Sequence, residues 1–331
     1  MEMEDQHRWS GPGGMVYAGL FLGASFVIFT KLKFRGAAFR SVAKLTGKTA
    51  IITGANTGIG KETALDFARR EARVILACRD IAKGQKAVEH IRRLTNAGEL
   101  VVMKLDLASL KSVNAFCEEF CNKVGRLDIL VNNAGVFHTP YTKTEDGFEL
   151  QFGVNHLGHF LLTNRLLDLL KASAPSRVII VSSALHKRGL LDFSKLNPEE
   201  SEYDKAKAYA NSKLANVLFG KELSKRLDDQ GVITYTLHPG VINTELARYL
   251  GYSKTFWAAT FPLRWLFMKS PWYGAQTTIY CAVADELEAV SGKYYGNCKE
   301  EPYPEVKGTA DDAVATKLWE VSERLTGLTS E

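Results

Sequence analysis

The chain has 331 residues, of which 46% are hydrophobic and 24% charged, and its formal net charge is +5. A chain of this length can bury the core of one large α/β domain or of two small ones. The basic residues show no stripe with interleaved aromatic residues, which argues against a nucleic-acid-binding protein. The five cysteines are scattered without a second Cys/His pair, so we expect reduced thiols, no metal site and a reducing environment; they are Cys78, Cys117, Cys121, Cys281 and Cys298.

The N-terminus predicts a membrane anchor. Residues 1–14 form a polar tail, residues 15–30 carry no charge, and residues 31–44 form a basic linker. As a helix, 15–30 spans about 24 Å, a little less than a hydrocarbon core of about 30 Å. The basic flank follows the apolar run, unlike in a cleaved signal peptide, and the positive-inside rule places the following domain in the cytosol. The alternative is a lone hydrophobic helix packed on the domain.

From residue 45 to residue 325, apolar runs alternate with helical patterns and no linker divides them. This alternation predicts a single doubly wound, Rossmann-type α/β domain with a parallel sheet flanked by helices. The expected strands are 49–53, 74–77, 101–105, 129–132, 178–182 and 233–237. The expected helices include 83–94, 110–124, 148–172 and 205–228.

The first strand leads into a glycine turn and a helix, which is how α/β sheets bind a dinucleotide. The turn reads T-G-A-N-T-G-I-G, with glycines at Gly54, Gly58 and Gly60. Such glycines let the backbone approach a pyrophosphate, whose charge the helix N-terminus attracts. The spacing matches neither G-x-G-x-x-G nor a Walker A loop, since Ile59 stands at the second Walker glycine and Glu62 follows the lysine. Taken alone, the turn also fits a strand–helix connection without a ligand.

The end of the second strand bears on the choice between NAD and NADP. NAD sites usually place an acidic residue there, whereas this chain has Cys78 followed by Arg79. A guanidinium suits a 2′-phosphate, so NADP(H) is favoured. Asp80 is either a displaced acidic residue or the N-cap of the next helix. Asp106, after the third strand, either accepts from the adenine amino group or closes a turn.

Two polar motifs follow at the fourth strand and in the next helix. Asn133 lies in N-N-A-G, at the carboxyl edge where open α/β sheets bind ligands. Asn155 begins N-H-L-G-H inside a helical pattern. Asparagine and glycine are unfavourable in helices, which indicates a specific role such as a hydrogen bond to the backbone or to water. We interpret His156 and His159 as packing or solvated residues, because no third metal ligand is evident.

Tyr209 and Lys213 are four residues apart, which places them on one helix face with Cβ atoms about 6 Å apart. An ammonium beside a phenol lowers the phenol pKa towards the working pH of proton transfer. Such a pair alone is usually a surface pair. The hydroxyls of Ser182 and Ser183, at the end of the fifth strand, favour the functional interpretation because one of them could donate to a substrate carbonyl.

The joint pattern resembles a known family. T-G-A-N-T-G-I-G, N-N-A-G, N-H-L-G-H, V-S-S, Y-A-N-S-K and H-P-G occur in the order and spacing of the classical short-chain dehydrogenase/reductases, over about 47–298. Residues 144–164 and 212–219 further resemble the microsomal retinol dehydrogenases. The resemblance implies an NADP(H)-dependent oxidoreductase that interconverts retinal and retinol, or similar lipophilic aldehydes and alcohols, at the endoplasmic reticulum membrane.

The resemblance leaves alternatives open. Lipid-derived aldehydes or steroids are other substrates for the same chemistry. A non-catalytic NADP(H) sensor would be expected to lack Ser183, Tyr209 or Lys213, and all three are present. Homodimerisation through the helices 148–172 and 205–228 is also implied.

The resemblance assigns a role to each matching residue. Tyr209 is the general acid/base, Lys213 holds the nicotinamide ribose and lowers the tyrosine pKa, and Ser183 binds and orients the substrate carbonyl. Asn155 orders a water in a proton relay. The expected cofactor-binding residues are Gly54, Asn56, Thr57, Gly58, Ile59, Gly60, Arg79, Asp106, Leu107, Asn133, Tyr209, Lys213, Pro239, Gly240 and Thr244.

Two segments depart from the generic pattern. A charged insertion over 185–208 separates Ser183 from Tyr209. Residues 249–272 contain aromatic residues at loosely helical spacing. They form either a lid over an apolar substrate that enters the membrane surface, or a segment packed on the sheet or on a partner subunit.

Overall fold

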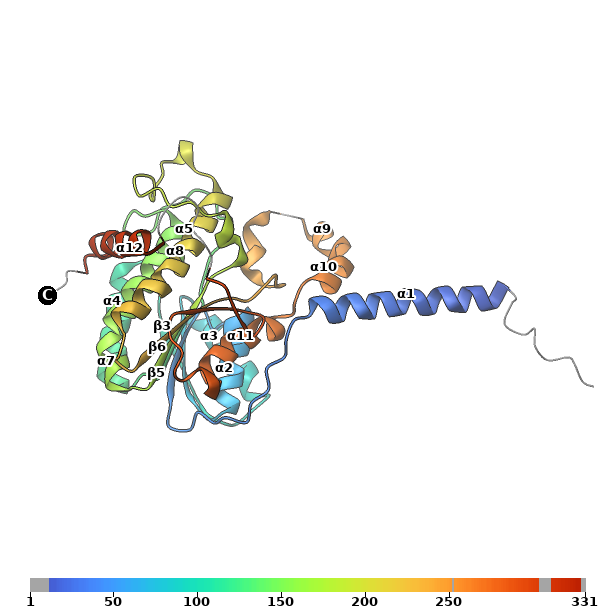
Figure 1. Cartoon of the computed structure of the whole chain (residues 1–331), viewed down its shortest axis with the longest axis horizontal. Coiled ribbons are helices and arrows are strands. Elements are labelled where there is room, and N and C mark those ends of the chain that lie inside the picture. The colour runs from blue at the N-terminus through green and yellow to red at the C-terminus, as the bar shows by residue number, and fades with distance from the viewer. Residues whose placement is uncertain (1–11, 252, 304–310, 329–331) are drawn as a thin grey trace, which may run out of the picture.

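The computed structural model describes residues 12–251, 253–303 and 311–328, so most of the expected polar tail lies outside the described residues. The described strands form one sheet with the order β3-β2-β1-β4-β5-β6-β7-β8, covered by helices on both faces (Figure 1). Their bounds are β1 Thr49–Thr53, β2 Arg73–Cys78, β3 Glu99–Lys104, β4 Ile129–Asn132, β5 Ser176–Val181, β6 Val232–His238, β7 Lys293–Gly296 and β8 Lys299–Glu301. The predicted doubly wound, Rossmann-type α/β fold is therefore confirmed.

The order of the strands reverses beside β1, which pairs in parallel with both β2 and β4. This reversal places the carboxyl ends of β1 and β4 at the edge where open α/β sheets bind ligands. Successive residues of β1 face opposite layers. Ile51 packs in the core under α4 (Leu110–Val124) and α6 (Gly158–Arg165), and Ile52 in the core under α2 (Gly58–Arg69) and α11 (Pro271–Val283). Both faces of the sheet are thus buried.

The sheet is not wholly parallel. β7 and β8 form an antiparallel hairpin that the sequence prediction missed. The turn between them puts Asn297 and Cys298 at φ values of 51° and 57°. β7 has four residues, K-Y-Y-G, and β8 has three charged residues, K-E-E, so neither has the apolar run by which the other strands were recognised.

Helices connect the strands in the alternating pattern that was predicted. They are α2 Gly58–Arg69, α3 Ile81–Arg92, α4 Leu110–Val124, α5 Leu150–Phe152, α6 Gly158–Arg165, α7 Leu167–Ala172, α8 Lys205–Arg226, α11 Pro271–Val283 and α12 Asp311–Thr326. The single helix expected over 148–172 was wrong. A π-helical turn, η1 Gly153–Leu157, interrupts it, and Asn155 lies at the centre of that turn.

The N-terminal helix α1, Pro12–Phe34, includes the predicted 15–30 helix and projects away from the sheet (Figure 1). In the described part of the chain, no helix is both long and apolar enough to cross a membrane. The expected membrane-spanning anchor is therefore not supported, and its apolar run is shorter than a hydrocarbon core of about 30 Å. The alternative, burial on the domain, also fails for most of α1, because side chains such as Phe21 and Leu22 are 73% and 68% exposed.

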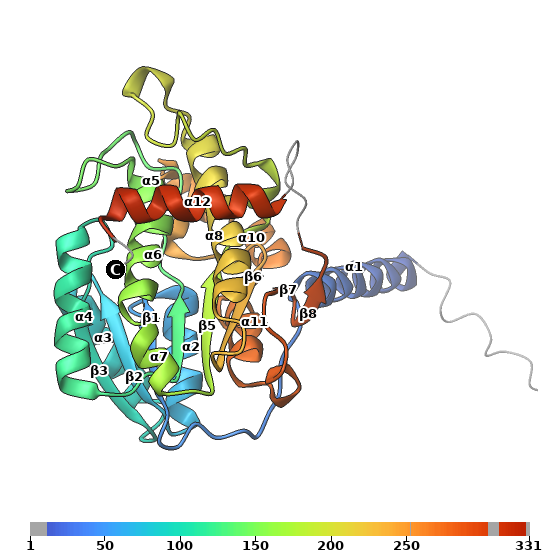
Figure 2. The same cartoon turned by 60° about the vertical axis from the view of Figure 1, so that its left-hand side comes forward.

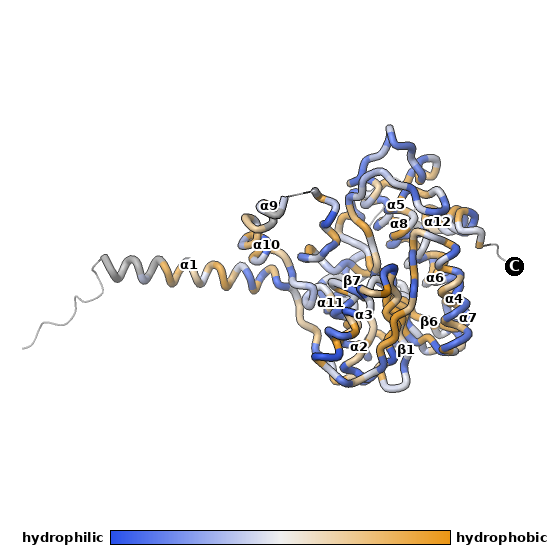
Figure 3. The backbone as a smooth tube through the Cα atoms, turned by 180° about the vertical axis from the view of Figure 1, so that it is seen from behind, coloured by the Kyte–Doolittle hydropathy of each residue, from blue (hydrophilic) through white to orange (hydrophobic). Residues whose placement is uncertain are grey.

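Short helices α9 Lys254–Ala259 and α10 Phe261–Phe267 carry the aromatic segment. Tyr252 lies outside the described residues. Phe261, Trp265 and Trp272 are exposed, so these side chains do not pack on the sheet. The C-terminal end of α1 lies beside α10, where the Phe34 and Phe267 rings meet edge to face with centroids 5.3 Å apart. Figure 3 shows apolar residues on α1 and α10, side by side at the same end of the molecule.

The C-terminal helix α12 lies across α6 and α8 (Figure 2). Its Leu318 packs with Leu214 and Leu218 of α8, and its Trp319 ring lies 5.0 Å from Phe160 of α6. This is the helical face expected to form a homodimer. In this structure α12 of the same chain occupies that face, so a dimer through it would require α12 to move.

Candidate active site

The glycine turn after β1 brings the backbone close to the tip of β4. Gly54 and Gly58 have φ values of +66° and +56°, which side chains rarely adopt. A Cβ at Gly60 would lie 2.7 Å from the carbonyl oxygen of Gly54, so only glycine lets α2 begin this close to the turn. The N-cap residue, Thr57, makes no side-chain capping bond. The first amides of α2 are therefore available to an anionic group.

A cleft of ≈ 280 Å³ lies at this edge of the sheet. Ten of the expected cofactor residues line it: Gly54, Asn56, Thr57, Gly58, Ile59, Arg79, Asp106, Leu107, Asn133 and Thr244. The other five expected residues, Gly60, Tyr209, Lys213, Pro239 and Gly240, do not line this cleft. Gly60 acts through close packing, and Gly240 has a φ of +90° and a Cβ position 3.1 Å from Cε of Lys269. Thr244 reaches the cleft because its Cγ2 lies 3.3 Å from a Cβ position at Gly58.

Asp80 was expected to be either the N-cap of the next helix or a displaced acidic residue of the cofactor site. The Asp80 carboxylate accepts from the Lys83 amide at 3.0 Å and caps α3, and this bond holds the pKa of Asp80 below its usual value. Asp80 is thus the N-cap of α3, and it also lines the cleft, so its position is compatible with the displaced acidic residue as well. Arg79 is exposed at the cleft with Lys83 also in the lining, and Lys104 Nζ donates to the Arg79 carbonyl at 2.7 Å. This end of the cleft is basic.

Asn133 ties the tip of β4 to the tip of β1. Its side-chain amide donates to the Thr53 carbonyl at 2.8 Å, and its backbone amide donates to Thr53 Oγ1 at 2.9 Å. Asp106 accepts from the Ala108 amide at 3.0 Å, which closes a turn, and it also lines the cleft. Both interpretations of Asp106 are therefore compatible with its position.

Tyr209 and Lys213 lie on one face of α8, as predicted, and are 4% exposed each. Lys213 Nζ lies 5.9 Å from the centroid of the Tyr209 ring and donates to the Val181 carbonyl at 3.0 Å. Burial lowers the pKa of Lys213 to about 8. Burial also raises the pKa of Tyr209 to about 12, against the opposing effect of a hydrogen bond with Ser183. Burial thus dominates the pKa of Tyr209, and the hydrogen bond with Ser183, not the charge of Lys213, is what opposes it in this structure.

Ser183 follows β5, and its Oγ accepts from the Leu185 amide at 3.2 Å. The π-helical turn directs Asn155 towards the same region: its side chain accepts from the Val136 amide at 2.8 Å and donates to Ser212 Oγ at 2.9 Å. Ser212 in turn donates to the Tyr209 carbonyl at 2.8 Å. Asn155 is thus connected through Ser212 to Tyr209, and Ser183 contacts Tyr209 directly, although the three segments are far apart in the chain.

Gly135 joins this site to the cleft. It lines the cleft, and a Cβ there would lie 3.2 Å from Asn155 Oδ1 and 3.6 Å from Lys213 Nζ. The absence of a side chain keeps the path open between the cleft and the two polar groups. The cleft therefore extends from the first turn of α2 to the neighbourhood of Lys213 Nζ.

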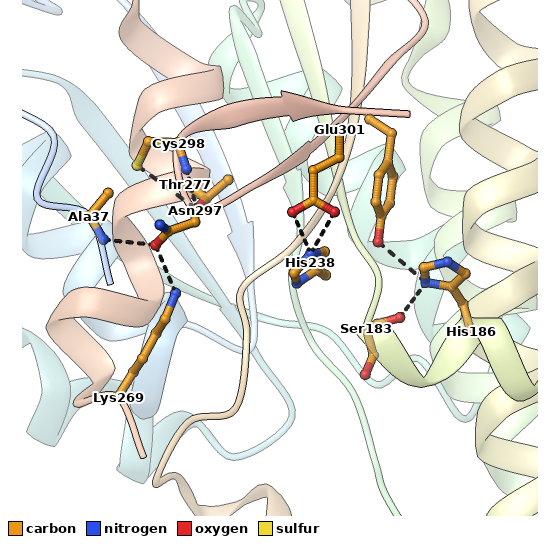
Figure 4. A network of polar contacts seen from close by, with 10 residues as sticks. Ala37, Ser183, His186, His238, Lys269, Thr277, Asn297, Cys298 and Glu301 are labelled. Carbon is orange, nitrogen blue, oxygen red and sulfur yellow. Dashed lines mark hydrogen bonds and ion pairs between the residues drawn. The ribbon is translucent and has the colours of Figure 1, made fainter. Parts of the chain in front are cut away.

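The β7–β8 hairpin contacts two segments of the site (Figure 4). His186 Nδ1 donates to the Ser183 carbonyl at 2.5 Å, and the Tyr294 hydroxyl lies 3.3 Å from the same nitrogen. His238, which precedes Pro239 in the chain, places Nε2 3.1 Å from a carboxylate oxygen of Glu301. The hairpin therefore supports both the Ser183 turn and the segment that leads to Thr244.

Sequence reasoning missed several residues of the cleft. Leu246 and Arg248 line it from a 3-10 turn, η4 Glu245–Leu250, together with Tyr249, the first residue of the predicted aromatic segment. Phe137, after β4, packs edge to face on the Tyr209 ring at 4.6 Å. The only sequence signal for these residues was their position directly after predicted motifs.

Comparisons with known proteins agree with this architecture. Residues 48–254 match the family model described as short chain dehydrogenase. The chain is 51% identical to retinol dehydrogenase 14 of Mus musculus over 292 residues, covering 85% of this chain and 86% of that protein. It is 52% identical to retinol dehydrogenase 13 of Homo sapiens over 308 residues, covering 92% of each.

A solved structure shares the fold. It is an uncharacterized protein from Mycobacterium Paratuberculosis, 36% identical, with a TM-score of 0.68 over 88% of this chain and 98% of that chain. Oxidoreductases of this family bind a nicotinamide nucleotide, which the glycine turn and the cleft accommodate. The chain therefore belongs to the short-chain dehydrogenase/reductase family, among relatives that are retinol dehydrogenases.

Proposed function

We propose that this protein is an NADP(H)-dependent oxidoreductase that interconverts retinal and retinol. The observation that carries the proposal is the convergence of Ser183, Tyr209, Lys213 and Asn155 beside Gly135, at one end of a cleft whose other end presents Arg79. Identities of about one half to two retinol dehydrogenases support retinoids as the substrate.

Each residue of the site has a task in carbonyl reduction. When bound, the nicotinamide supplies a hydride to the substrate carbon. Ser183 Oγ accepts from the Leu185 amide, and its own proton, directed at Tyr209 in the free protein, turns to the carbonyl oxygen of a bound substrate. Tyr209, with a pKa raised to about 12, is protonated at neutral pH and donates its proton to the same oxygen. Lys213 binds the ribose beside Gly135. A protonated phenol is the form that carbonyl reduction requires.

We also infer that the protein works at a membrane surface, where retinoids partition. Apolar residues of α1 and α10 lie at the same end of the molecule (Figure 3). The side chain of Leu263, on α10, is 60% exposed. Lys33 follows the apolar part of α1, is exposed and suits anionic headgroups.

The proposal is tested by following NADPH oxidation with carbonyls delivered in phosphatidylcholine/phosphatidylserine vesicles. The panel comprises all-trans-retinal, a lipid-derived enal and a steroid ketone, and flotation of the same samples reports membrane binding. We expect co-flotation and the highest kcat/KM with retinal. Turnover of the enal or the steroid ketone in preference to retinal would contradict retinal as the substrate. Tight NADPH binding without any turnover would favour the sensor alternative.

The basic end of the cleft predicts the cofactor preference. Arg79→Ala is expected to raise the KM for NADPH about 10- to 100-fold and leave the KM for NADH unchanged, because it removes a charged hydrogen-bond donor to the 2′-phosphate. Steady-state kinetics with both cofactors measure this. Lys86→Ala, an exposed residue outside the cleft, is the matched control and should change neither value. Equal losses with NADPH and NADH would contradict the role of Arg79.

A further inference from the structure

His159 is a buried residue that the proposed chemistry does not use. It lies on α6, is 1% exposed and contacts two segments of the site in opposite directions. Its Nδ1 is 3.0 Å from the Asn155 carbonyl oxygen, and its Nε2 is 2.9 Å from Thr53 Oγ1. The earlier interpretation of His159 as a packing or solvated residue is therefore incomplete.

The hydrogen-bond partners fix the tautomer of His159. A carbonyl oxygen only accepts, so the bond to Asn155 requires the proton on Nδ1. Nε2 is then an acceptor and takes the hydroxyl proton of Thr53, at a shorter distance than the 3.4 Å contact of that hydroxyl with the Val131 carbonyl. Burial lowers the pKa of His159 to about 4, so the ring is neutral at working pH.

The two ends of this bridge lead to different parts of the site. At one end, Asn155 stands in the π-helical turn and its side chain holds Val136. At the other end, Thr53 Oγ1 accepts from the backbone amides of Asn133 and Ala134, both at 2.9 Å. These two residues line the cleft, so one imidazole connects the catalytic turn to the wall of the cofactor cleft.

We propose that His159 is a positioning residue that sets the spacing between the Asn155 turn and the Asn133–Ala134 wall of the cofactor cleft. The inference rests on the proposed function, because the Asn155 turn is taken to serve carbonyl reduction. Neutral imidazole donates at one end and accepts at the other, which matches the two partners that His159 contacts. The Asn155 end governs the reaction step, and the Thr53 end governs cofactor binding.

A matched control lies one turn away on the same helical run. His156 is also fully buried, and its Nε2 is 2.9 Å from Ser322 Oγ of α12, away from the cleft. Replacement of either histidine removes a buried hydrogen bond and should lower the melting temperature. Only replacement of His159 should change the kinetics, which separates positioning from a purely structural role.

Two substitutions of His159 test its hydrogen bonds to Asn155 and to Thr53 separately. Asparagine at 159 retains a donor near the position of Nδ1, and glutamine retains an acceptor near the position of Nε2. We expect His159→Asn to keep kcat within about 3-fold and to weaken NADPH binding about 10-fold, since a buried hydroxyl loses its partner. We expect His159→Gln to keep the Kd for NADPH within about 3-fold and to lower kcat about 100-fold, since the Asn155 turn shifts. The readouts are the Kd by NADPH fluorescence, kcat with retinal and the melting temperature of the free protein.

The proposal is overturned if both His159 variants lose kcat and NADPH affinity together, in proportion to the fall in melting temperature. It is also overturned if their kcat and Kd values are the same as those of His156→Asn. If the wild type turns over no carbonyl, the proposed function fails, while the Kd comparison still decides the Thr53 end. Should the His159 variants not fold, Thr53→Ser and Thr53→Val replace them. Thr53→Ser keeps the hydroxyl and is expected to bind NADPH like the wild type. Thr53→Val lacks it and is expected to bind NADPH about 10-fold more weakly. Equal affinities would contradict the bridge.

Discussion

Replacement of Tyr209 by phenylalanine is expected to lower kcat for retinal reduction about 10²- to 10⁴-fold, the range for loss of a general acid. The substitution removes one oxygen atom, which has no hydrogen bond to the backbone that the fold would lose. The ring keeps its edge-to-face contact with Phe137 at 4.6 Å and its burial. The Kd for NADPH should therefore stay within a few-fold. NADPH oxidation and fluorescence titration measure the two quantities.

Tyr203→Phe is the matched control. Its hydroxyl donates to the Thr139 carbonyl at 3.0 Å and accepts from Gln151 at 2.9 Å, away from Lys213. This variant should lose some stability and retain most of kcat. A Tyr209→Phe enzyme that keeps more than about a tenth of the wild-type kcat would exclude Tyr209 as the proton donor.

Trp319→Ala is expected to lower the free energy of unfolding by about 3–5 kcal/mol, the range for truncation of a large buried aromatic side chain. Trp319 is 5% exposed and packs against Phe160 and Phe219, with ring centroids 5.0 Å and 5.8 Å away. The guanidinium of Arg226 lies over the same ring at 4.4 Å. Loss of these contacts should loosen α12 from α6 and α8. Urea denaturation measures the change in stability, and light scattering measures any self-association.

Glu320→Ala tests the same helix without touching its packed face, because Glu320 is exposed. Its effect should stay within about 0.5 kcal/mol. If Trp319→Ala is equally mild, α12 does not contribute to the core as its contacts indicate. Dimerisation of Trp319→Ala but not of the wild type would show that α12 covers a surface able to self-associate.

The central fold could be predicted because its strands are apolar runs buried on both faces. β1 and β4 have the predicted bounds, and the other strands among β1–β6 differ by one or two residues at their ends. The β7–β8 hairpin, α11 and α12 could not, since their positions depend on contacts with residues far away in the chain. The helix over 148–172 was wrong because a helical pattern does not reveal a π-helical turn around Asn155.

The site was predictable where a motif supplies its own geometry. The glycine turn and the Tyr209–Lys213 pair depend on local spacing alone. The pKa of Tyr209 could not be predicted, because it depends on burial by Phe137 and other residues that are distant in the chain. The position of α10 against α1 and the double contact of His159 likewise arise only when the chain has folded.

The central claim is transfer of a hydride from NADPH to a retinoid carbonyl at the site of Tyr209. The most direct test is a single turnover of the full chain with NADPH deuterated at C4 and all-trans-retinal, followed by mass spectrometry of the retinoid. The account predicts retinol with one added deuterium on the former carbonyl carbon for the wild type, and no retinol in the same time for Tyr209→Phe. Unlabelled retinol from NADPH deuterated on either face, or labelled retinol in equal yield from both proteins, would contradict it.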